Sequence, residues 1–196
     1  MRMARGFNEH EKEVIGKKLV ESAQKYAATI GMRKTSLDQI TADAGISKPM
    51  FYKFYETKEH LFLKVIEDWH HELIQTSLSI IRDRTDLPVK ERLVQCIMNT
   101  LKYMDQRSMI QLLAEDIPYI TRRIPDAVQV HYASHESFLQ PIIQAAGVRF
   151  KVDFELVSAL IHTLIWTMAS KEEVGPRYYD AAELLARATI EFIVEE

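Results

Sequence analysis

Apolar residues recur at steps of three and four along almost the whole chain of 196 residues, and this periodicity limits the possible folds most strongly. The sustained alternation that marks β-strands is absent, and so are the Asn-Gly and Asp-Gly pairs that favour hairpins. Only six glycines and six prolines occur, and most lie where a helix should begin or end. The sequence therefore predicts an all-α protein with about nine helices.

Two amino-terminal helices are each expected to end at a glycine. The first should cover residues 9–30 and stop at Gly31, which can adopt the left-handed conformation. After a short basic link, the second should begin after Ser36, because Ser36 and Gln39 have the spacing of a capping box. This second helix should end at Gly45.

The stretch that follows this second glycine is both basic and aromatic. GISKPMFYKFYETKEHLF, residues 45–62, contains three lysines and five aromatic residues. A short helix over about residues 47–55 would direct Phe51 and Tyr55 inward, because residues four apart share a helix face. Two short helices joined by a tight glycine turn are typical of a helix-turn-helix, whose second helix enters the major groove of DNA. The outward-facing residues of this short helix are therefore candidates for DNA contacts.

Charge is distributed unevenly around the net value of −3. Residues 1–58 contain 11 Lys and Arg against 7 Asp and Glu, whereas the rest of the chain contains 14 against 21. A basic head on an acidic body agrees weakly with nucleic-acid binding. Because no apolar run is long enough to span a bilayer and the first residues lack a signal-peptide core, we expect a cytoplasmic protein. A single cysteine, Cys96, excludes an internal disulfide and a thiolate metal cluster.

The segment TSLDQITADAGISKPMFYKFYETKEHLF resembles the TetR family of bacterial transcriptional regulators. It has the family's Thr or Ser before the second helix, Ala-Gly at the turn, an aromatic pair, and a lysine at the start of the fourth helix. The resemblance covers about residues 10–68. It implies a helical homodimer with an amino-terminal DNA-binding domain and a variable ligand-sensing domain.

Three positions depart from the family pattern. Pro49 replaces a frequent glycine, Phe54 replaces a frequent histidine or tyrosine, and Tyr55 replaces the usual phenylalanine. Pro49 also removes a backbone N–H that could otherwise approach a phosphate. These differences affect the expected base preference rather than the fold.

Helix geometry and the resemblance together assign roles in DNA binding. Lys48 can donate to guanine O6 and N7, and Pro49 and Met50 can contact a thymine methyl group. Other residues should contact the phosphate backbone, because helix amino termini and lysines favour anions. The full set of candidates is Lys34, Thr35, Ser36, Ser47, Lys48, Pro49, Met50, Tyr52, Lys53 and Lys58.

The remainder of the chain, residues 71–196, is expected to form a helical ligand-binding and dimerisation domain after a DNA-binding domain of residues 1–70. Its five helices should cover residues 88–105, 107–117, 124–146, 153–173 and 178–195, with a break between Pro118 and Pro125 and a kink at Pro141. The last two helices are apolar on more than one face, which predicts a dimer interface. The residues expected there are Leu156, Ala159, Leu160, Leu164, Ala181, Leu184, Leu185, Ala188 and Phe192.

The resemblance also implies a small-molecule inducer, which we expect to be apolar or aromatic because the middle helices carry deformable and ring-bearing side chains. The candidate ligand-binding residues are Met98, Leu101, Met104, Met109, Tyr132, His135, Phe138, His162 and Trp166. We expect no cofactor. The preferred function is that of a repressor, released from a pseudo-palindromic operator by its inducer.

Two other classes of function remain open at this point. The spacing of His131 and His135 would allow both imidazoles to bind one metal ion, with His162 as a third ligand, in a helical metal-dependent enzyme. No phosphate-binding glycine loop, serine nucleophile motif or spaced carboxylate pair supports an enzyme. Alternatively, the short basic helix could dock on a protein groove. Salt-sensitive binding to random duplex DNA would separate a regulator from both alternatives.

Overall fold

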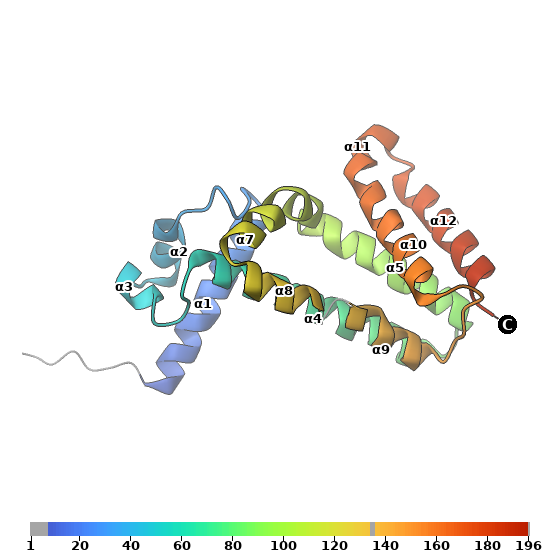
Figure 1. Ribbon diagram of the computed structural model, residues 1–196, viewed down its shortest axis with the longest axis horizontal. Coiled ribbons are helices and arrows are strands. Elements are labelled where there is room, and N and C mark those ends of the chain that lie inside the picture. Colours follow the sequence, from blue (N-terminus) through green and yellow to red (C-terminus); the bar gives the residue numbers. More distant parts are fainter. Residues whose placement is uncertain (1–7, 134–135, 196) are drawn as a thin grey trace, which may run out of the picture. The chain divides into compact units, whose positions relative to one another are not determined.

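The computed structural model describes residues 8–133 and 136–195 and shows an all-α protein (Figure 1). Outside its helices, the described chain forms one isolated antiparallel bridge, between Phe150 and Val194. No helix in these two ranges is long and apolar enough to cross a membrane. The helices are α1 (Glu9–Ala27), α2 (Leu37–Ala44), α3 (Lys48–Phe51), α4 (Lys58–Asp83), α5 (Val89–Gln106), α6 (Met109–Gln111), α7 (Ile117–Arg123), α8 (Pro125–Ala133), α9 (Glu136–Ala146), α10 (Phe154–Trp166), α11 (Lys171–Val174) and α12 (Tyr178–Ile193), with a π-helical turn at Leu112–Asp116 and a 3-10 turn at Thr167–Ser170.

The chain divides into two compact units. The amino-terminal unit comprises the residues up to Glu67 together with Leu112–Val128, and the carboxy-terminal unit comprises Asp68–Gln111 and Gln129–Glu196. The expected boundary lies near residue 70, whereas the first part of the compact amino-terminal unit ends at Glu67 and the unit also includes the later segment Leu112–Val128. The reason is that the π-helical turn and α7 pack with the amino-terminal helices, although they are distant in sequence.

The amino-terminal unit is built as its capping signals predict. Ser36 and Gln39 form the predicted capping box at the start of α2, and Gly45 ends α2 with a left-handed φ of 70°. Asn8 and Glu11 form a second capping box at the start of α1, which the sequence analysis did not identify. Within this unit, α2 contacts both α1 and α3 (Figure 1).

The carboxy-terminal unit is organised around α5. Helix α12 packs along α5, and α10 packs along α12 (Figure 1). Ion pairs between exposed and half-exposed side chains join α5 to α12, with Lys90 Nζ 2.9 Å from Glu191 Oε1 and Arg187 Nη2 2.9 Å from Glu91 Oε1. The bridge of Phe150 to Val194 ties the loop before α10 to the end of α12.

The predicted break between Pro118 and Pro125 is wrong, because most of this stretch forms α7. Pro118 is tolerated in the first turn of α7, where its missing N–H is not needed for the helical ladder. The π-helical turn directly before α7 also alters the hydrogen-bond register at this point. In the following region, the expected long helix is described as α8 and α9, and Pro141 lies inside α9.

Candidate nucleic-acid interface

Helix α3 is a single turn that depends on its buried ring. Phe51 is completely buried, and its ring centroid lies 5.5 Å from that of Tyr52 and 5.9 Å from that of Tyr55. A helix of four residues cannot persist in water without such packing. Phe51 therefore fixes which side of α3 faces outward.

The outward side of α3 presents cations and an aromatic hydroxyl. Tyr52 is 58% exposed, and Lys48 and Lys53 are exposed as well. The Nζ of Lys48 lies 2.8 Å from Asp38 Oδ1, and the hydrogen bond to this carboxylate raises the pKa of Lys48. Because both partners are exposed, this ion pair is weak and an incoming phosphate or base can replace it. We call Lys48, at the start of α3, and Tyr52 and Lys53, directly after its end, the α3 face.

The other predicted contacts on α3 occupy its first turn. Ser47 and Pro49 are exposed and Met50 is half-buried, so all three reach the surface beside the α3 face. Ser47 is the N-cap by position, but its side chain makes no capping hydrogen bond. The Ser47 hydroxyl is therefore not committed to the helix end.

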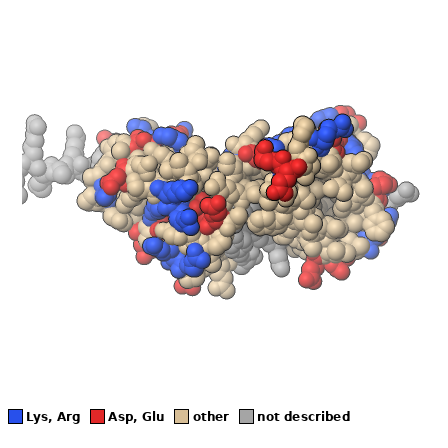
Figure 2. Space-filling view, turned by 90° about the horizontal axis from the view of Figure 1, so that it is seen from above, with Lys and Arg blue, Asp and Glu red and all other residues tan. Residues whose placement is uncertain are grey.

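The amino terminus of α2 is a second exposed candidate. The Ser36 hydroxyl accepts the Gln39 N–H at 3.2 Å, and the Gln39 side chain accepts the Ser36 N–H at 2.8 Å. The Ser36 hydroxyl retains its own proton for a phosphate, and the helix end adds partial positive charge. Lys34 is exposed in the link just before it. Figure 2 shows Lys and Arg side chains gathered on the visible face of the amino-terminal unit, with acidic side chains beside them.

Lys58 has an internal role that the sequence did not predict. Its Nζ donates to the backbone carbonyls of Met32 at 3.1 Å and Thr35 at 2.6 Å, and burial lowers the pKa of Lys58. Two of the three ammonium protons are thus used inside the protein, which leaves one for a phosphate. Lys58 primarily fastens the start of α4 to the link between α1 and α2.

Thr35 needs a correction. Its side chain is almost fully buried, and its hydroxyl donates to the Gly31 carbonyl at 2.7 Å. A side chain in this position cannot reach DNA. The sequence suggested an exposed Thr35 because it follows two basic residues, whereas its hydroxyl satisfies the backbone of the link.

Three residues of the segment 112–128 also belong to this region and were missed. The Tyr119 hydroxyl donates to Glu59 Oε1 at 3.0 Å, and the Arg123 guanidinium lies 5.1 Å from the centre of the Tyr119 ring. Asp116 is buried against the link between α1 and α2. No local sequence signal indicates these contacts, because the partners are 60 or more residues apart.

The predicted dimer-interface residues form an exposed apolar stripe on the carboxy-terminal unit. On α12, Leu184 is 69% exposed and Phe192 is 75% exposed, while Ala182, Ala186 and Ile190 on the opposite side are buried. The exposed residues of the set, which we call the α10–α12 stripe, are Leu156, Ala159, Ala181, Leu184, Leu185, Ala188 and Phe192. Leu160 and Leu164 are half-buried on α10.

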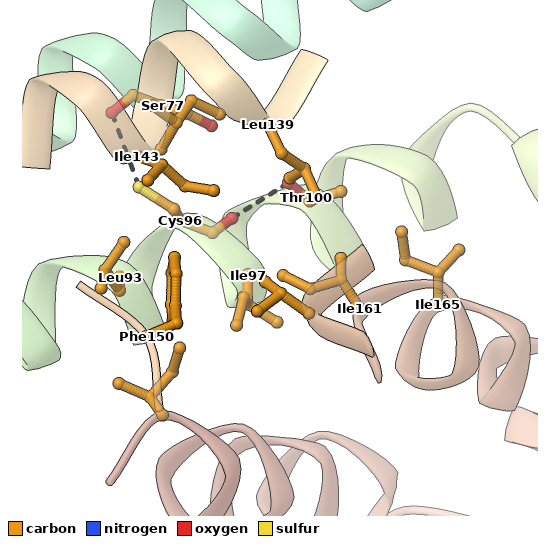
Figure 3. A pocket seen from close by; sticks show the side chains of 13 residues that line it. Ser77, Leu93, Cys96, Ile97, Thr100, Leu139, Ile143, Phe150, Ile161 and Ile165 are labelled. Carbon is orange, nitrogen blue, oxygen red and sulfur yellow. Dashed lines mark hydrogen bonds between the residues drawn. The ribbon is translucent and has the colours of Figure 1, made fainter. Parts of the chain in front are cut away.

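The carboxy-terminal unit also encloses an apolar cavity of about 60 Å³ (Figure 3). Aliphatic side chains dominate its lining, and the few polar groups are already engaged in part: the Cys96 thiol donates to the Ser77 carbonyl at 3.5 Å, and the Thr100 hydroxyl donates to the Cys96 carbonyl at 3.0 Å. Burial raises the pKa of Cys96 to about 11, so its thiol is unreactive. The other lining residues are Leu93, Ile97, Leu139, Ile142, Ile143, Phe150, Val157, Ile161, Ile165 and Ile190.

Among the predicted ligand-binding residues whose side chains the structure describes, none lines this cavity. Four of them are buried elsewhere in the unit, namely Met98, Leu101, Met104 and Met109. His162 and Trp166 are exposed. Tyr132, His135 and Phe138, together with the proposed metal ligand His131, lie outside the side chains that the structure describes. Among the described residues, no group of three or more potential ligands could hold a metal ion.

Comparison with known proteins supports the helix-turn-helix assignment. Residues 19–65 match the family model of bacterial regulatory proteins of the tetR family. The chain is 27% identical over 134 residues to the HTH-type transcriptional regulator YuxN of Bacillus subtilis, a match that covers 67% of this chain and 45% of YuxN. It is 22% identical over 92 residues to YdgC of the same organism, covering 46% and 47%. The matches thus span less than half the length of these relatives.

Solved structures share the fold over most of the chain. The reduced form of NemR from Escherichia coli has a TM-score of 0.67 and 14% identity, covering 91% of this chain and 97% of NemR. A TetR-family regulator from Mesorhizobium loti has a TM-score of 0.59 and 20% identity, covering 94% and 96%. FadR from Bacillus subtilis, solved in complex with stearoyl-CoA, has a TM-score of 0.57 and 15% identity, covering 89% and 95%. Residues 19–65 thus carry the match to the tetR family model, and the solved structures show that the fold is shared over most of the chain.

Proposed function

We propose that this protein is a homodimeric repressor that reads a pseudo-palindromic operator through the α3 face and is released by a small apolar inducer. The observation that carries the DNA-binding role is the division of α3 into a buried anchor, Phe51, and an exposed side with Lys48, Tyr52 and Lys53. The two lysines and the tyrosine hydroxyl of this exposed side can donate to phosphates and base edges. A reading helix this short contacts only a few base pairs, so two copies are needed for an operator of useful length.

The α10–α12 stripe supports the dimer. Residues 181, 184, 185, 188 and 192 recur at helical spacing on the side of α12 that faces away from its own unit, and all are exposed. A continuous apolar face on a soluble protein usually marks an interaction surface. Because a second copy carries the same stripe, a twofold axis can bury both faces at once.

The cavity supports an apolar inducer. The described residues of its lining include no charged side chain, which disfavours a charged group of a ligand inside it. A typical ligand pocket measures about 300 to 1,000 Å³, whereas this cavity measures about 60 Å³. A guest therefore has to push the surrounding helices apart. That displacement provides a physical reason for ligand binding to change the protein's conformation. The likeness in fold to FadR, solved with stearoyl-CoA, agrees with an aliphatic guest.

Duplex DNA binding by matched charge variants tests the reading surface. Lys48→Ala/Lys53→Ala should weaken binding to a fluorescent random-sequence duplex at low salt and flatten its salt dependence, because two phosphate or base contacts are lost. Lys17→Ala/Lys18→Ala removes the same charge from exposed positions on α1 and should leave binding nearly unchanged. Equal losses for the two double variants would show that only net charge matters and would refute the α3 face.

Thermal unfolding with small probes tests the ligand class. Medium-chain alkanols should raise the unfolding temperature of the wild-type protein, because a guest that binds only the folded state stabilises it. Ile161→Phe fills the cavity and should abolish this shift. If neither alkanols nor aromatic alcohols stabilise the protein, the cavity is ordinary imperfect packing and the inducer proposal fails.

A further inference from the structure

Asp116 is a buried carboxylate that binds the backbone of another segment. It is only 3% exposed at the end of the π-helical turn. Its Oδ2 accepts the Met32 N–H at 2.9 Å, and its Oδ1 accepts the Arg33 N–H at 3.0 Å. A buried carboxylate is costly unless such donors satisfy it. Asp116 thus binds the link between α1 and α2 through hydrogen bonds from two adjacent backbone amides.

The link is shaped to receive this carboxylate. Gly31 has a φ of +83°, which disfavours any side chain, and a Cβ at this position would lie 3.2 Å from Asp116 Oδ2. On the carbonyl side, Lys58 Nζ binds Met32 and Thr35, as described above. The Asp116 carboxylate therefore binds backbone amides of the link, while the Lys58 ammonium binds its backbone carbonyls. These two sets of hydrogen bonds restrict the movement of the link.

The elements fixed in this way carry predicted DNA contacts. The link leads directly into Ser36, the N-cap of α2, and Lys58 opens α4. A second anchor from the same segment, the hydrogen bond of Tyr119 to Glu59, holds the first turn of α4. The segment that carries Asp116 and Tyr119 thus sets the positions of the two helix starts that flank the reading helix.

The chain runs from a helix that lines the cavity to Asp116. Helix α5 lines the cavity with Ile97 and Thr100, and then leads through α6 into the π-helical turn that ends at Asp116. Single π-helical turns are frequent at functional sites, because their extra residue displaces the side chains that follow. Asp116 therefore ends the chain segment that leaves the proposed ligand site, and its two hydrogen bonds connect that segment to the α1–α2 link.

We propose that Asp116 is a positioning residue for DNA binding, which holds the α1–α2 link in the geometry that the reading elements require. This inference rests on the proposed function and adds a residue in the segment 112–128 that controls it. Withdrawal of the carboxylate would leave the buried Met32 amide and the partly buried Arg33 amide without their acceptor and would release the link. Displacement of the π-helical turn is then a direct way for the sensing region to weaken DNA binding.

The test compares three variants of the full-length protein. Asp116→Asn keeps the shape but places an NH₂ group against one amide donor, and Asp116→Ala removes both acceptors. Glu115→Gln neutralises the neighbouring, exposed carboxylate and is the matched control. The probe is a duplex that the wild-type protein selects from a random-sequence pool, and binding is measured by fluorescence anisotropy well below each unfolding temperature.

Asp116→Asn should weaken binding by about tenfold, because a hydrogen bond to a charged group is lost, and Asp116→Ala should weaken it further, whereas Glu115→Gln should bind as the wild type does. Amide hydrogen exchange should accelerate at Met32 and Arg33 in both Asp116 variants but remain unchanged at Ile40 and Leu61, which a general loss of stability would also affect. Binding retained by a folded Asp116→Asn variant, or unchanged exchange at the two link amides, would overturn the inference alone. A wild-type protein that selects no duplex would refute the proposed function itself.

Discussion

Helices α3 and α12 differ in the exposure of their phenylalanines. In α3, Phe51 is completely buried and the exposed positions carry lysines and a tyrosine hydroxyl. In α12, Phe192 is 75% exposed among leucines and alanines that face away from the unit. Both helices thus present a surface that their own unit does not cover, but the chemistry of the two surfaces differs.

The two surfaces suit different partners because their chemistry differs. A polyanion is bound by hydrogen-bond donors and positive charge, which an isolated helix can display without loss of solubility. A second protein surface is bound by removing apolar area from water, which leaves an exposed apolar stripe when the partner is absent. We therefore propose DNA as the partner of α3 and a second copy of the chain as the partner of α12.

The largest expected effect comes from exchanging the two phenylalanines for alanine. Phe51→Ala should destabilise the protein by about 3 to 5 kcal/mol, because it leaves a cavity under α3. Phe192→Ala should change the folding of a subunit very little, since the ring is mostly exposed within the chain. Urea unfolding at low protein concentration measures both. Similar losses of unfolding free energy for the two variants would contradict the assignment of Phe51 to the core and of Phe192 to an interface.

A charge within the α10–α12 stripe should break the dimer. Leu184→Glu is expected to weaken self-association by about 2 to 4 kcal/mol, the range of a residue at the centre of an interface. Sedimentation velocity at micromolar concentration should then shift from a dimer to a 22.8-kDa species. Val174→Glu is the control, because Val174 is 53% exposed but lies on α11, outside the stripe. A wild-type protein that sediments as a monomer would contradict the dimer.

Single lysine variants should separate base reading from phosphate binding on the α3 face. Lys48→Ala is expected to cost about 1 to 3 kcal/mol and to do so unevenly across operator variants, because Lys48 can reach base edges. Lys53→Ala should weaken binding to all variants about equally. Lys58→Ala is a poorer probe of phosphate contact, since it also frees the carbonyls of Met32 and Thr35. Competition binding with a set of mutated duplexes measures the loss of affinity for each sequence. A uniform loss for Lys48→Ala would show that Lys48 contacts the DNA phosphate backbone and not the bases.

The smallest expected effect is a pH dependence at Glu59. Burial alone would raise the pKa of Glu59, but its backbone N–H, the hydroxyls of Tyr119 and Thr57, and the Lys58 ammonium together lower it below its ordinary 4.5. Ionised Glu59 therefore stabilises the fold above pH 4.5, and this contribution is lost as the pH falls through the lowered pKa. Chemical unfolding at several pH values should show that the wild type and Glu59→Gln converge in stability under acid. A constant difference at every pH would exclude this contribution.

Local signals in the sequence predicted the helix ends but not the contacts between distant segments. The capping box at Ser36 and the left-handed Gly45 were confirmed, because each depends on residues within a few positions. Pro118 misled the prediction, since the π-helical turn before α7 has no recognisable sequence signature. Asp116 and Lys58 both bind backbone atoms of the link, and backbone atoms carry no sequence information.

The same distinction explains the candidate sites. The α3 face and the α10–α12 stripe lie on one or two helices, so helical periodicity was enough to identify exposed members such as Tyr52 and Phe192. The cavity requires side chains from several helices, and the sequence analysis named the buried methionines instead of Ile97 and Thr100 on a neighbouring face of α5. Periodicity predicts which face of a helix is buried, but the packing of several helices decides which buried residues line a cavity.

Selection of bound fragments from the source genome tests whether two copies of the α3 face read one operator. The wild-type protein should enrich fragments that share an inverted repeat, with half-sites about one helical turn or a multiple of it apart, because two copies of α3 read equivalent sequences. The enrichment should disappear for Lys48→Ala/Lys53→Ala and persist for Lys17→Ala/Lys18→Ala. Enrichment of the same fragments by both double variants, or no inverted repeat among the fragments, would contradict the account.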